Sequence, residues 1–308
     1  GDDGFAAAIC VIMIVLTVVM FFAQRYLANR STYTMTALKP IVAEKASGLR
    51  NIMAHGIVYI VTGLAILPQL VVVYTSFLRS NGGQVFTGGY ALQSYEATLF
   101  AKDNTVIWNT YFLGIVAIAI VLVMGVIIAY LSVRKKNLLN SILDTVTMFP
   151  FIIPGSVLGI SFLFAFNSPP IVLSGTALIM IISFAIRRMP YTVRSSVAAL
   201  GQISKNVEEA AISLGASDLT TFRRITLPMM MPGVLAGAIM SWVTIISELS
   251  SSIILYTTAN QTLTVSIYTE VIRGNYGNAS AYATILALTS ILSLLIFFKL
   301  TGRRDISI

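Results

Sequence analysis

The stretch that decides the fold runs from Val207 to Pro232 and reads VEEAAISLGASDLTTFRRITLPMMMP. It carries several charges and has a helix-forming composition, whereas apolar runs of membrane length dominate the sequence on both sides. A polar helix in so apolar a chain has no reason to lie in lipid. We therefore infer that this stretch contacts a partner outside the membrane.

The composition is that of a membrane protein with several spans. Of the 308 residues, 56% are hydrophobic and only 10% are charged, and the mean hydropathy is +0.86. So few charges cannot cover a water-soluble surface of this size. The net charge of +8 does not indicate a nucleic-acid partner, because the basic residues lie in short connections between apolar runs.

Seven apolar segments reach or approach the length of about 20 residues that an α-helix needs to cross a membrane. They are Gly4 to Ala23, Ala54 to Phe77, Val106 to Ser132, Thr145 to Phe166, Ile171 to Ile186, Met229 to Leu249 and Ala281 to Leu300. Prolines lie in or beside several of them, which membrane helices tolerate where neighbouring helices satisfy the freed backbone groups. The sequence therefore predicts an all-α, polytopic membrane protein.

The distribution of Lys and Arg predicts the orientation, because cytoplasmic connections carry the excess of these residues. One alternate set of connections (25–50, 134–136, 187–224 and 299–304) holds 17 basic residues, and the other set (78–105, 167–170 and 250–280) holds only 3. We expect the N-terminus outside, the C-terminus inside, and the stretch from Val207 in the cytoplasm. The chain itself is expected in a bacterial plasma or inner membrane.

Within this stretch the sequence predicts a helix, a turn and a second helix. Asn206 is a candidate N-cap, and the two glutamates that follow lie in the first turn, where carboxylates favour the helix dipole. Gly215 supplies a C-cap or a tight turn. Ser217 and the aspartate after it cap a second helix over 219–226, which enters the next span.

Sequence motifs for catalysis or ATP binding are absent. The sequence contains no Gly-x-x-x-x-Gly-Lys, His-Glu-x-x-His or Gly-x-Ser-x-Gly pattern. The lone Cys10 and the lone His55 have no second thiol or imidazole beside which to bind a metal, so we assign them structural or interfacial roles. We expect no enzyme activity and no cofactor in this chain, and energy from a partner.

The polar stretch resembles a known family. Glu209-Ala210-Ala211, Gly215, Ile225 and Leu227-Pro228 agree in identity and in three spacings with the EAA loop of the permease subunits of binding-protein-dependent ATP-binding-cassette importers. By this resemblance the helix is a coupling helix that inserts into a cleft of a cytoplasmic ATPase subunit. The residues that the resemblance assigns to this contact are Glu208, Glu209, Ala210, Ala211, Leu214 and Gly215.

The resemblance also implies the architecture and the partners. It covers residues 54–302 and implies a type I importer permease core of six transmembrane helices, with the EAA loop at 207–228, preceded here by one extra helix. The implied partners are two ATPase subunits, which bind ATP and Mg²⁺, a second permease half, and an external solute-binding protein.

Within the family, the segment from Glu248 to Tyr256 (ELSSSIILY) is similar to the ferric-iron branch, in which two permease halves are often fused in one chain. By this resemblance, residues 1–24 form the last helix of a preceding half, residues 25–53 a cytoplasmic linker and residues 303–308 a cytoplasmic tail. A basic exit after a Phe pair ends both the first and the last apolar run, which fits such a repeat. The sequence holds one EAA loop, so a second must come from another permease half.

Glu248 is the candidate residue for the solute path. It follows Pro228 by about 20 residues, or about 30 Å of helix, which predicts a position near the external side of the membrane. A hard carboxylate, with the hydroxyls of Ser250, Ser251 and Ser252, suits transient contact with a hard cation, although no firm metal site is predicted. The alternative is a packing or gating hydrogen bond at the helix end.

Several functions remain open at this stage. Ferric iron is the favoured cargo, and polyamine, phosphonate or sugar-phosphate importers share the fold and the loop. A secondary transporter independent of ATP would show paired charges at mid-membrane, whereas the predicted spans carry almost none. A membrane-embedded enzyme would need a cluster of His, Asp or Glu residues.

Overall fold

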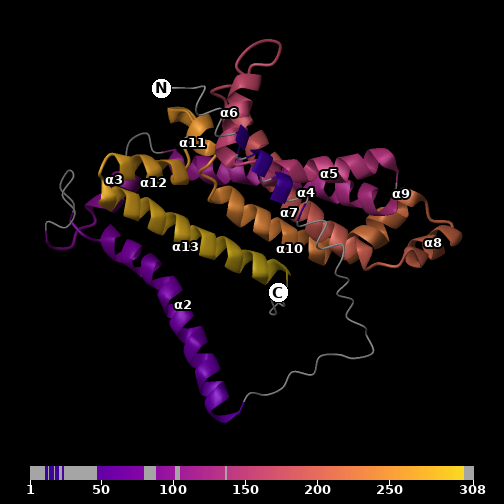
Figure 1. Ribbon diagram of the computed structural model, residues 1–308, viewed down its shortest axis with the longest axis horizontal. Coiled ribbons are helices and arrows are strands. Elements are labelled where there is room, and N and C mark those ends of the chain that lie inside the picture. The colour runs from indigo at the N-terminus through magenta and orange to yellow at the C-terminus, as the bar shows by residue number, and fades with distance from the viewer. Residues whose placement is uncertain are drawn as a thin grey trace.

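Helix α7 (Ala177–Gly201) lies at the centre of the computed structural model and packs against α4 (Val106–Arg134), α5 (Leu138–Ile152) and α10 (Leu227–Ile246) (Figure 1). The structure describes residues 47–79, 88–100, 105–135 and 137–301, and scattered positions between 11 and 23. Most of the first predicted span, the linker up to residue 46 and the tail 303–308 lie outside the described residues.

The other elements are also helical. They are α2 (Gly48–Ser76), α3 (Gln93–Leu99), α6 (Gly155–Ala165), α8 (Lys205–Ser213), α9 (Asp218–Thr221), the π-helical turn Phe222–Thr226, α11 (Ser252–Leu255), the 3-10 turn Thr258–Asn260, α12 (Leu263–Ile272) and α13 (Tyr276–Thr301). Within the described ranges there is no β-strand, and the sheet-like pairing there is an isolated bridge between Leu78 and Tyr90. The all-α prediction is confirmed.

Four helical segments among the described residues are long and apolar enough to cross a membrane. They are α2, α4, residues 218–246 and α13, which correspond to the second, third, sixth and seventh predicted spans. Each helix extends beyond its apolar run at one end or both, because hydropathy marks only the part of a helix that suits lipid, although α2 and the segment 218–246 end one and three residues before their runs do. The chain therefore crosses the membrane several times.

The fourth predicted span is broken rather than straight. Helices α5 and α6 meet at an angle of 109°, and the pair counts as one span only if the bend is included. Ile153, the residue before Pro154, has an extended backbone (φ −71°, ψ 129°). A proline ring disfavours the helical conformation of the residue before it, which explains the break at this point.

The fifth predicted span was placed wrongly. The sequence prediction ended it at Ile186 and assigned Arg187 and Arg188 to a cytoplasmic connection, but α7 continues to Gly201, and both arginines lie in its middle. The hydropathy criterion stopped at the first charges, whereas these charges are paired inside the protein. Removing Arg187, Arg188 and Arg194 from the connections lowers the basic count from 17 to 14 against 3, so the orientation prediction keeps its basis.

Small residues let α10 approach α7 closely. A Cβ atom at Gly237 would lie 2.7 Å from the Cα of Thr192, and one at Gly233 would overlap the Cβ of Ala199. Ser241 continues this stripe, and its hydroxyl lies 2.9 Å from the Thr192 hydroxyl and donates to the Arg188 carbonyl at 2.9 Å. Close backbone approach through glycine and serine is the usual way in which membrane helices associate, and here it fixes the position of Arg188.

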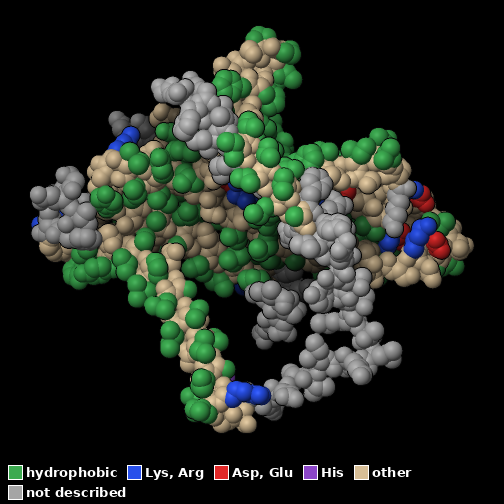
Figure 2. All heavy atoms as spheres, in the orientation of Figure 1, with side chains coloured by type: hydrophobic (Ala, Val, Ile, Leu, Met, Phe, Trp, Pro, Cys, Tyr) green, Lys and Arg blue, Asp and Glu red, His purple; other side chains and the backbone are tan. Residues whose placement is uncertain are grey.

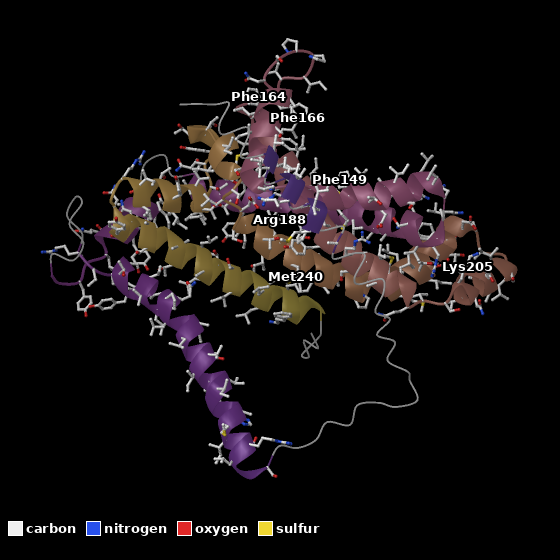
Figure 3. The ribbon with its side chains drawn as sticks, in the orientation of Figure 1. Phe149, Phe164, Phe166, Arg188, Lys205 and Met240 are labelled. Atoms are coloured by element: carbon white, nitrogen blue, oxygen red, sulfur yellow. The ribbon has the colours of Figure 1, made fainter. Side chains whose placement is uncertain are left out.

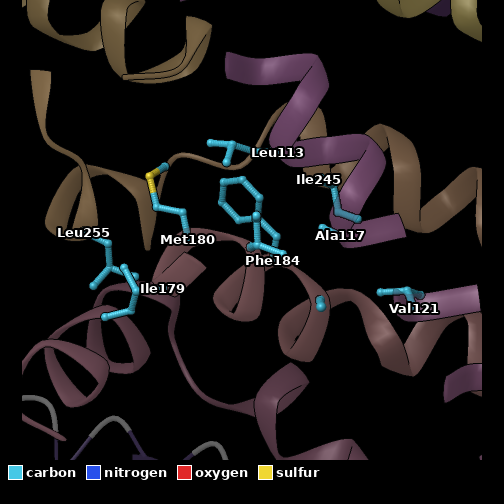
Figure 4. Close-up of a cluster of buried hydrophobic side chains, with 10 residues drawn as sticks. Leu113, Ala117, Val121, Ile179, Met180, Phe184, Ile245 and Leu255 are labelled. Carbon is cyan, nitrogen blue, oxygen red and sulfur yellow. The ribbon is translucent and has the colours of Figure 1, made fainter. Parts of the chain in front are cut away.

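A buried apolar cluster joins the same helices nearer the start of α7. Leu113 and Ala117 of α4, Met180 and Phe184 of α7, and Ile245 of α10 pack together (Figure 4). Lipid surrounds such a bundle, so side-chain packing rather than the exclusion of water from the helices stabilises it. Helix α7 is therefore held rigidly by its neighbours.

Helix α2 diverges from this bundle. In Figure 1 it meets the bundle at one end, where it contacts α13, and its other end projects away. None of the 18 residues in its most apolar window is buried in the structure. Its apolar surface (Figure 2) suits a hydrophobic surrounding along its whole length.

Candidate coupling segment and buried charge cluster

Helix α8 begins two residues earlier than the sequence predicts. Ser204 has an extended backbone, and its hydroxyl accepts a hydrogen bond from the Asn206 amide at 3.3 Å. Ser204, not Asn206, is therefore the N-cap, and Asn206 lies in the first turn. Both residue types cap helices well, so their order along the chain could not be decided from propensity alone.

Gly215 ends α8, as the sequence predicts. Its φ of +91° is in the left-handed region that favours glycine. The Gly215 amide donates to the Ile212 carbonyl at 2.9 Å, and the Ala216 amide donates to the Ala211 carbonyl at 3.1 Å. These two bonds form a Schellman motif, which satisfies the last carbonyls of the helix and reverses the chain.

The second predicted helix, over 219–226, is not a separate element. The Ser217 hydroxyl caps α9 by accepting from the Thr220 amide at 3.3 Å, as predicted. The chain then passes from α9 through the π-helical turn directly into α10, so that residues 218–246 form one continuous helical segment. One turn, at Gly215, therefore separates α8 from the continuous segment that contains α10.

The first of the two glutamates in α8 points into the protein. Glu208 is only 7% exposed, and its Oε1 accepts hydrogen bonds from Arg134 Nε at 2.9 Å and from the Thr226 hydroxyl at 3.0 Å. Arg134 also donates to the Ile203 carbonyl at 2.9 Å. Glu208 and Arg134, which we call the α8 clamp, join α8 to the end of α4 and to the start of α10.

The other face of α8 is open. Glu209, Ala210, Leu214 and Gly215 are exposed, and Leu214 is 89% exposed, whereas Ala211 is buried beside Glu208. Acidic and basic side chains gather at this end of the molecule, where Lys205 lies (Figures 2 and 3). The structure therefore divides the predicted coupling residues into four that face outward and two that hold the helix in place.

One outward residue was not among the predicted coupling residues. Leu219 of α9 is 74% exposed and follows the Gly215 turn, so a second large apolar side chain lies close to Leu214 in the sequence on this open surface. The sequence could have indicated this role for Leu219, because an apolar residue in a short polar helix has no lipid to face. Exposed leucines at a polar end of a membrane protein suit a protein partner.

Glu248 lies in the break between α10 and α11, and it is 2% exposed. One carboxylate oxygen accepts from Arg187 and the other from Arg188. The Ser251 amide also donates to this carboxylate, at 3.2 Å. We call Arg187, Arg188 and Glu248 the central charge cluster, and Figure 3 shows Arg188 in the middle of the bundle, far from Lys205 on α8.

The central charge cluster changes one of the sequence predictions. Arg187 and Arg188 lie within α7 rather than in a connection, so a helix that was predicted to be almost free of charge carries a pair of charges in its middle. The position of Glu248 near the external side of the membrane stays a prediction. Apolar residues recur through the second half of α7, at Met189, Val193, Val197 and Leu200. This helical period was the signal that could have kept the two arginines within the helix.

The three serines beside Glu248 have different positions. The Ser251 and Ser252 side chains are fully buried, and the Ser252 hydroxyl donates to the Glu248 carbonyl at 2.9 Å. Ser250 is exposed and packs near Gly155. A transient contact of Glu248 with a cation stays a prediction, and it would require the cation to replace both arginines.

The comparisons with known proteins agree with this architecture. Residues 121–304 match the family "Binding-protein-dependent transport system inner membrane component". The ferric transport system permease protein FbpB of Actinobacillus pleuropneumoniae is 30% identical over 98% of this chain and 44% of that protein. A putative 2-aminoethylphosphonate transport system permease protein, PhnV, of Salmonella typhimurium is 26% identical over 77% of this chain and 89% of that protein.

A solved structure shows the same fold. The crystal structure of a bacterial ABC transporter that imports the acidic polysaccharide alginate aligns with a TM-score of 0.65 and 14% identity, over 83% of this chain and 97% of the matched chain. The chain spans less than half the length of the ferric permease that it resembles. With the match over residues 121–304, the chain belongs to the family of binding-protein-dependent transport system inner membrane components.

Proposed function

We propose that the chain is the permease subunit of an ATP-driven importer, which passes a solute from an external binding protein into the cytoplasm. The observation that carries this proposal is the two-sided arrangement of α8. Its inner face is bound to α4 and α10 through the α8 clamp, and its outer face presents Glu209 and Leu214 to a partner. A helix held in this way moves with the spans when its partner moves.

The proposed partners follow from this role. Two cytoplasmic ATPase subunits bind ATP and Mg²⁺, and one of them receives α8. A second permease half completes the solute path. The excess of basic residues in one set of connections supports an external N-terminus and a cytoplasmic C-terminus, which places α8 on the side where ATP is available.

Ferric iron is the cargo that we favour, because the ferric permease FbpB is 30% identical over nearly the whole chain. A phosphonate is the second candidate, supported by the similarity to PhnV over most of that protein's length. Uptake of ⁵⁵Fe and of radiolabelled 2-aminoethylphosphonate by the same reconstituted transporter separates the two cargoes.

The test of the coupling role is a charge placed on the outer face of α8. We expect Leu214→Asp to abolish co-purification with the ATPase subunit and to lower ATP-dependent uptake at least tenfold, because an apolar contact surface gains an unpaired charge. Glu209→Lys, a charge reversal on the same face, should act in the same direction.

The matched control is Leu138→Asp. Leu138 begins α5 and is 77% exposed, so this variant adds the same charge to another exposed leucine. Uptake and co-purification should stay near wild type in the control. If Leu214→Asp and Glu209→Lys both retained the ATPase and normal uptake, the coupling role of α8 would be wrong.

A further inference from the structure

The central charge cluster has more positive than negative charge. Two guanidinium groups share the one carboxylate of Glu248, so the three side chains carry a net charge of +1. The carboxylate is 1% exposed as a side chain, and the arginines are 14% and 16% exposed. Charges within a membrane span are costly and mark solute paths more often than simple structural contacts.

The carboxylate is fixed more firmly than the arginines. The Ser251 amide donates to Glu248 Oε1 at 3.2 Å, and the Glu248 carbonyl accepts from the Thr264 hydroxyl at 2.8 Å. Both contacts hold the turn between α10 and α11. The guanidinium groups are the ends of long side chains on α7, so they can reorient without a change in the backbone.

The absence of a side chain at the start of α6 leaves space for the Arg187 guanidinium. A Cβ atom at Gly155 would overlap the Arg187 guanidinium and would lie 2.6 Å from the Ser250 Cβ. Gly155 is also the first residue of an 11-residue helix, whose N-terminal amides add positive potential at the same place. The start of α6 therefore adds positive potential beside the guanidinium of Arg187.

The arginines also have unused hydrogen-bonding capacity. Arg188 Nε is buried and has no hydrogen-bond partner in the structure. Each guanidinium has five N–H donors in a planar fork, which matches the oxygens of carboxylates, phosphonates and phosphates. One carboxylate cannot satisfy the donors of two such groups, so an additional oxyanion would find partners here.

We propose that Arg187 and Arg188 form an anion-recognition site in the solute path and that Glu248 is its internal counter-ion, which an anionic solute group partly replaces. This inference rests on the proposed import function. The substrate class is a small solute with a carboxylate, phosphonate or phosphate group, or a ferric ion enclosed in such anionic ligands. A bare ferric ion would be repelled by the net positive charge.

The test is the binding of methylphosphonate to the purified transporter in nanodiscs, followed by ³¹P NMR line broadening. Glu248→Gln raises the local charge from +1 to +2 and should tighten binding on the order of tenfold. Arg188→Met leaves a neutral pair of Arg187 and Glu248 and should abolish binding at this site. The charges of Arg187 and Glu248 cancel in this variant, so we expect Arg188→Met to fold. It therefore still tests the proposal if Glu248→Gln does not fold.

Arg194→Met is the matched control, since it removes an arginine from the same helix. Arg194 pairs with Asp144 at 3.2 Å, outside the central charge cluster. It should bind methylphosphonate as the wild type does, and any binding by the ATPase subunits is common to all variants. If Arg188→Met and Glu248→Gln also bound as the wild type does, the cluster would be a structural ion pair and the proposal would be wrong.

Two arms distinguish the source of the anion. If the solute itself carries it, 2-aminoethylphosphonate competes with methylphosphonate and ferric citrate does not. If the anion encloses a metal, ferric citrate competes and the ferric ion without citrate does not. Failure of the import proposal has a different signature, in which the wild type shows no ATP-dependent uptake while the differences in methylphosphonate binding persist.

Discussion

Two buried carboxylates, Glu208 and Glu248, each pair with arginines from another helix, but the α8 clamp is balanced and the central charge cluster is not. Glu208 meets one arginine, so the pair is neutral, and its Oε1 also accepts from the Thr226 hydroxyl. Glu248 meets two arginines, one of which keeps a buried Nε without a partner. An arginine–glutamate pair therefore joins helices in the α8 clamp, whereas in the central charge cluster one positive charge is left over for a ligand.

The largest effect is expected when the balanced pair is broken. Arg134→Met leaves Glu208 buried without a counter-charge, and we expect the free energy of unfolding to fall by roughly 3 to 5 kcal/mol. Chemical denaturation in mixed micelles measures this change. Arg223→Met, at an exposed arginine, is the control, and the double variant Arg134→Met/Glu208→Gln should recover much of the loss. Equal stability of Arg134→Met and the control would show that the clamp does not hold α8.

A smaller effect is expected from the close packing of α10 against α7, the helix that carries both arginines of the central charge cluster. Gly237→Val adds atoms against the Thr192 Cα and the Tyr191 carbonyl, which are backbone atoms and cannot move aside. We expect a loss of about 1 to 3 kcal/mol in the free energy of unfolding, together with weaker methylphosphonate binding, because Arg188 moves with α7. Gly63→Val in α2 is the control, since nothing lies within 4 Å of that site. Unchanged binding in Gly237→Val would separate the packing of α7 from the anion site.

The smallest effect is expected at an exposed ion pair. Comparing it with the buried Arg134–Glu208 pair shows how much burial adds to the contribution of an ion pair to the free energy of unfolding. Lys205 Nζ lies 3.4 Å from Glu209 Oε1, and the two side chains are 66% and 59% exposed. Lys205→Met should change the free energy of unfolding by less than about 0.5 kcal/mol, because solvent screens the pair. The same denaturation assay measures it. A loss as large as that of Arg134→Met would mean that burial does not explain the difference between these pairs.

The sequence predicted the coupling segment well because its signals are local. Gly215 ends a helix through its own backbone conformation, and Ser217 caps a helix through an amide three residues away, so both act within one turn of the chain. Both predictions are confirmed. The N-cap at Asn206 was wrong for the same local reason, since Ser204 competes with it. Several spans followed from hydropathy, which is also a local property.

The predictions that failed depended on partners far away in the chain. Hydropathy stopped the fifth span at Arg187 because a charge without a partner is costly in lipid, and the partner is 61 positions further on. The break at Pro154 could have been predicted, since a proline restricts the residue before it, but membrane helices often accommodate proline.

By itself, the sequence determined that the chain is an all-α membrane protein with a polar helix, a glycine turn and a continuing helix between two apolar runs. Only the tertiary structure decided that Glu208 faces inward while Glu209 faces outward, and that Glu248 meets two arginines. The physical reason is that a buried charge persists only beside a partner, and which partner it finds depends on how closely α7 and α10 pack through Gly233 and Gly237.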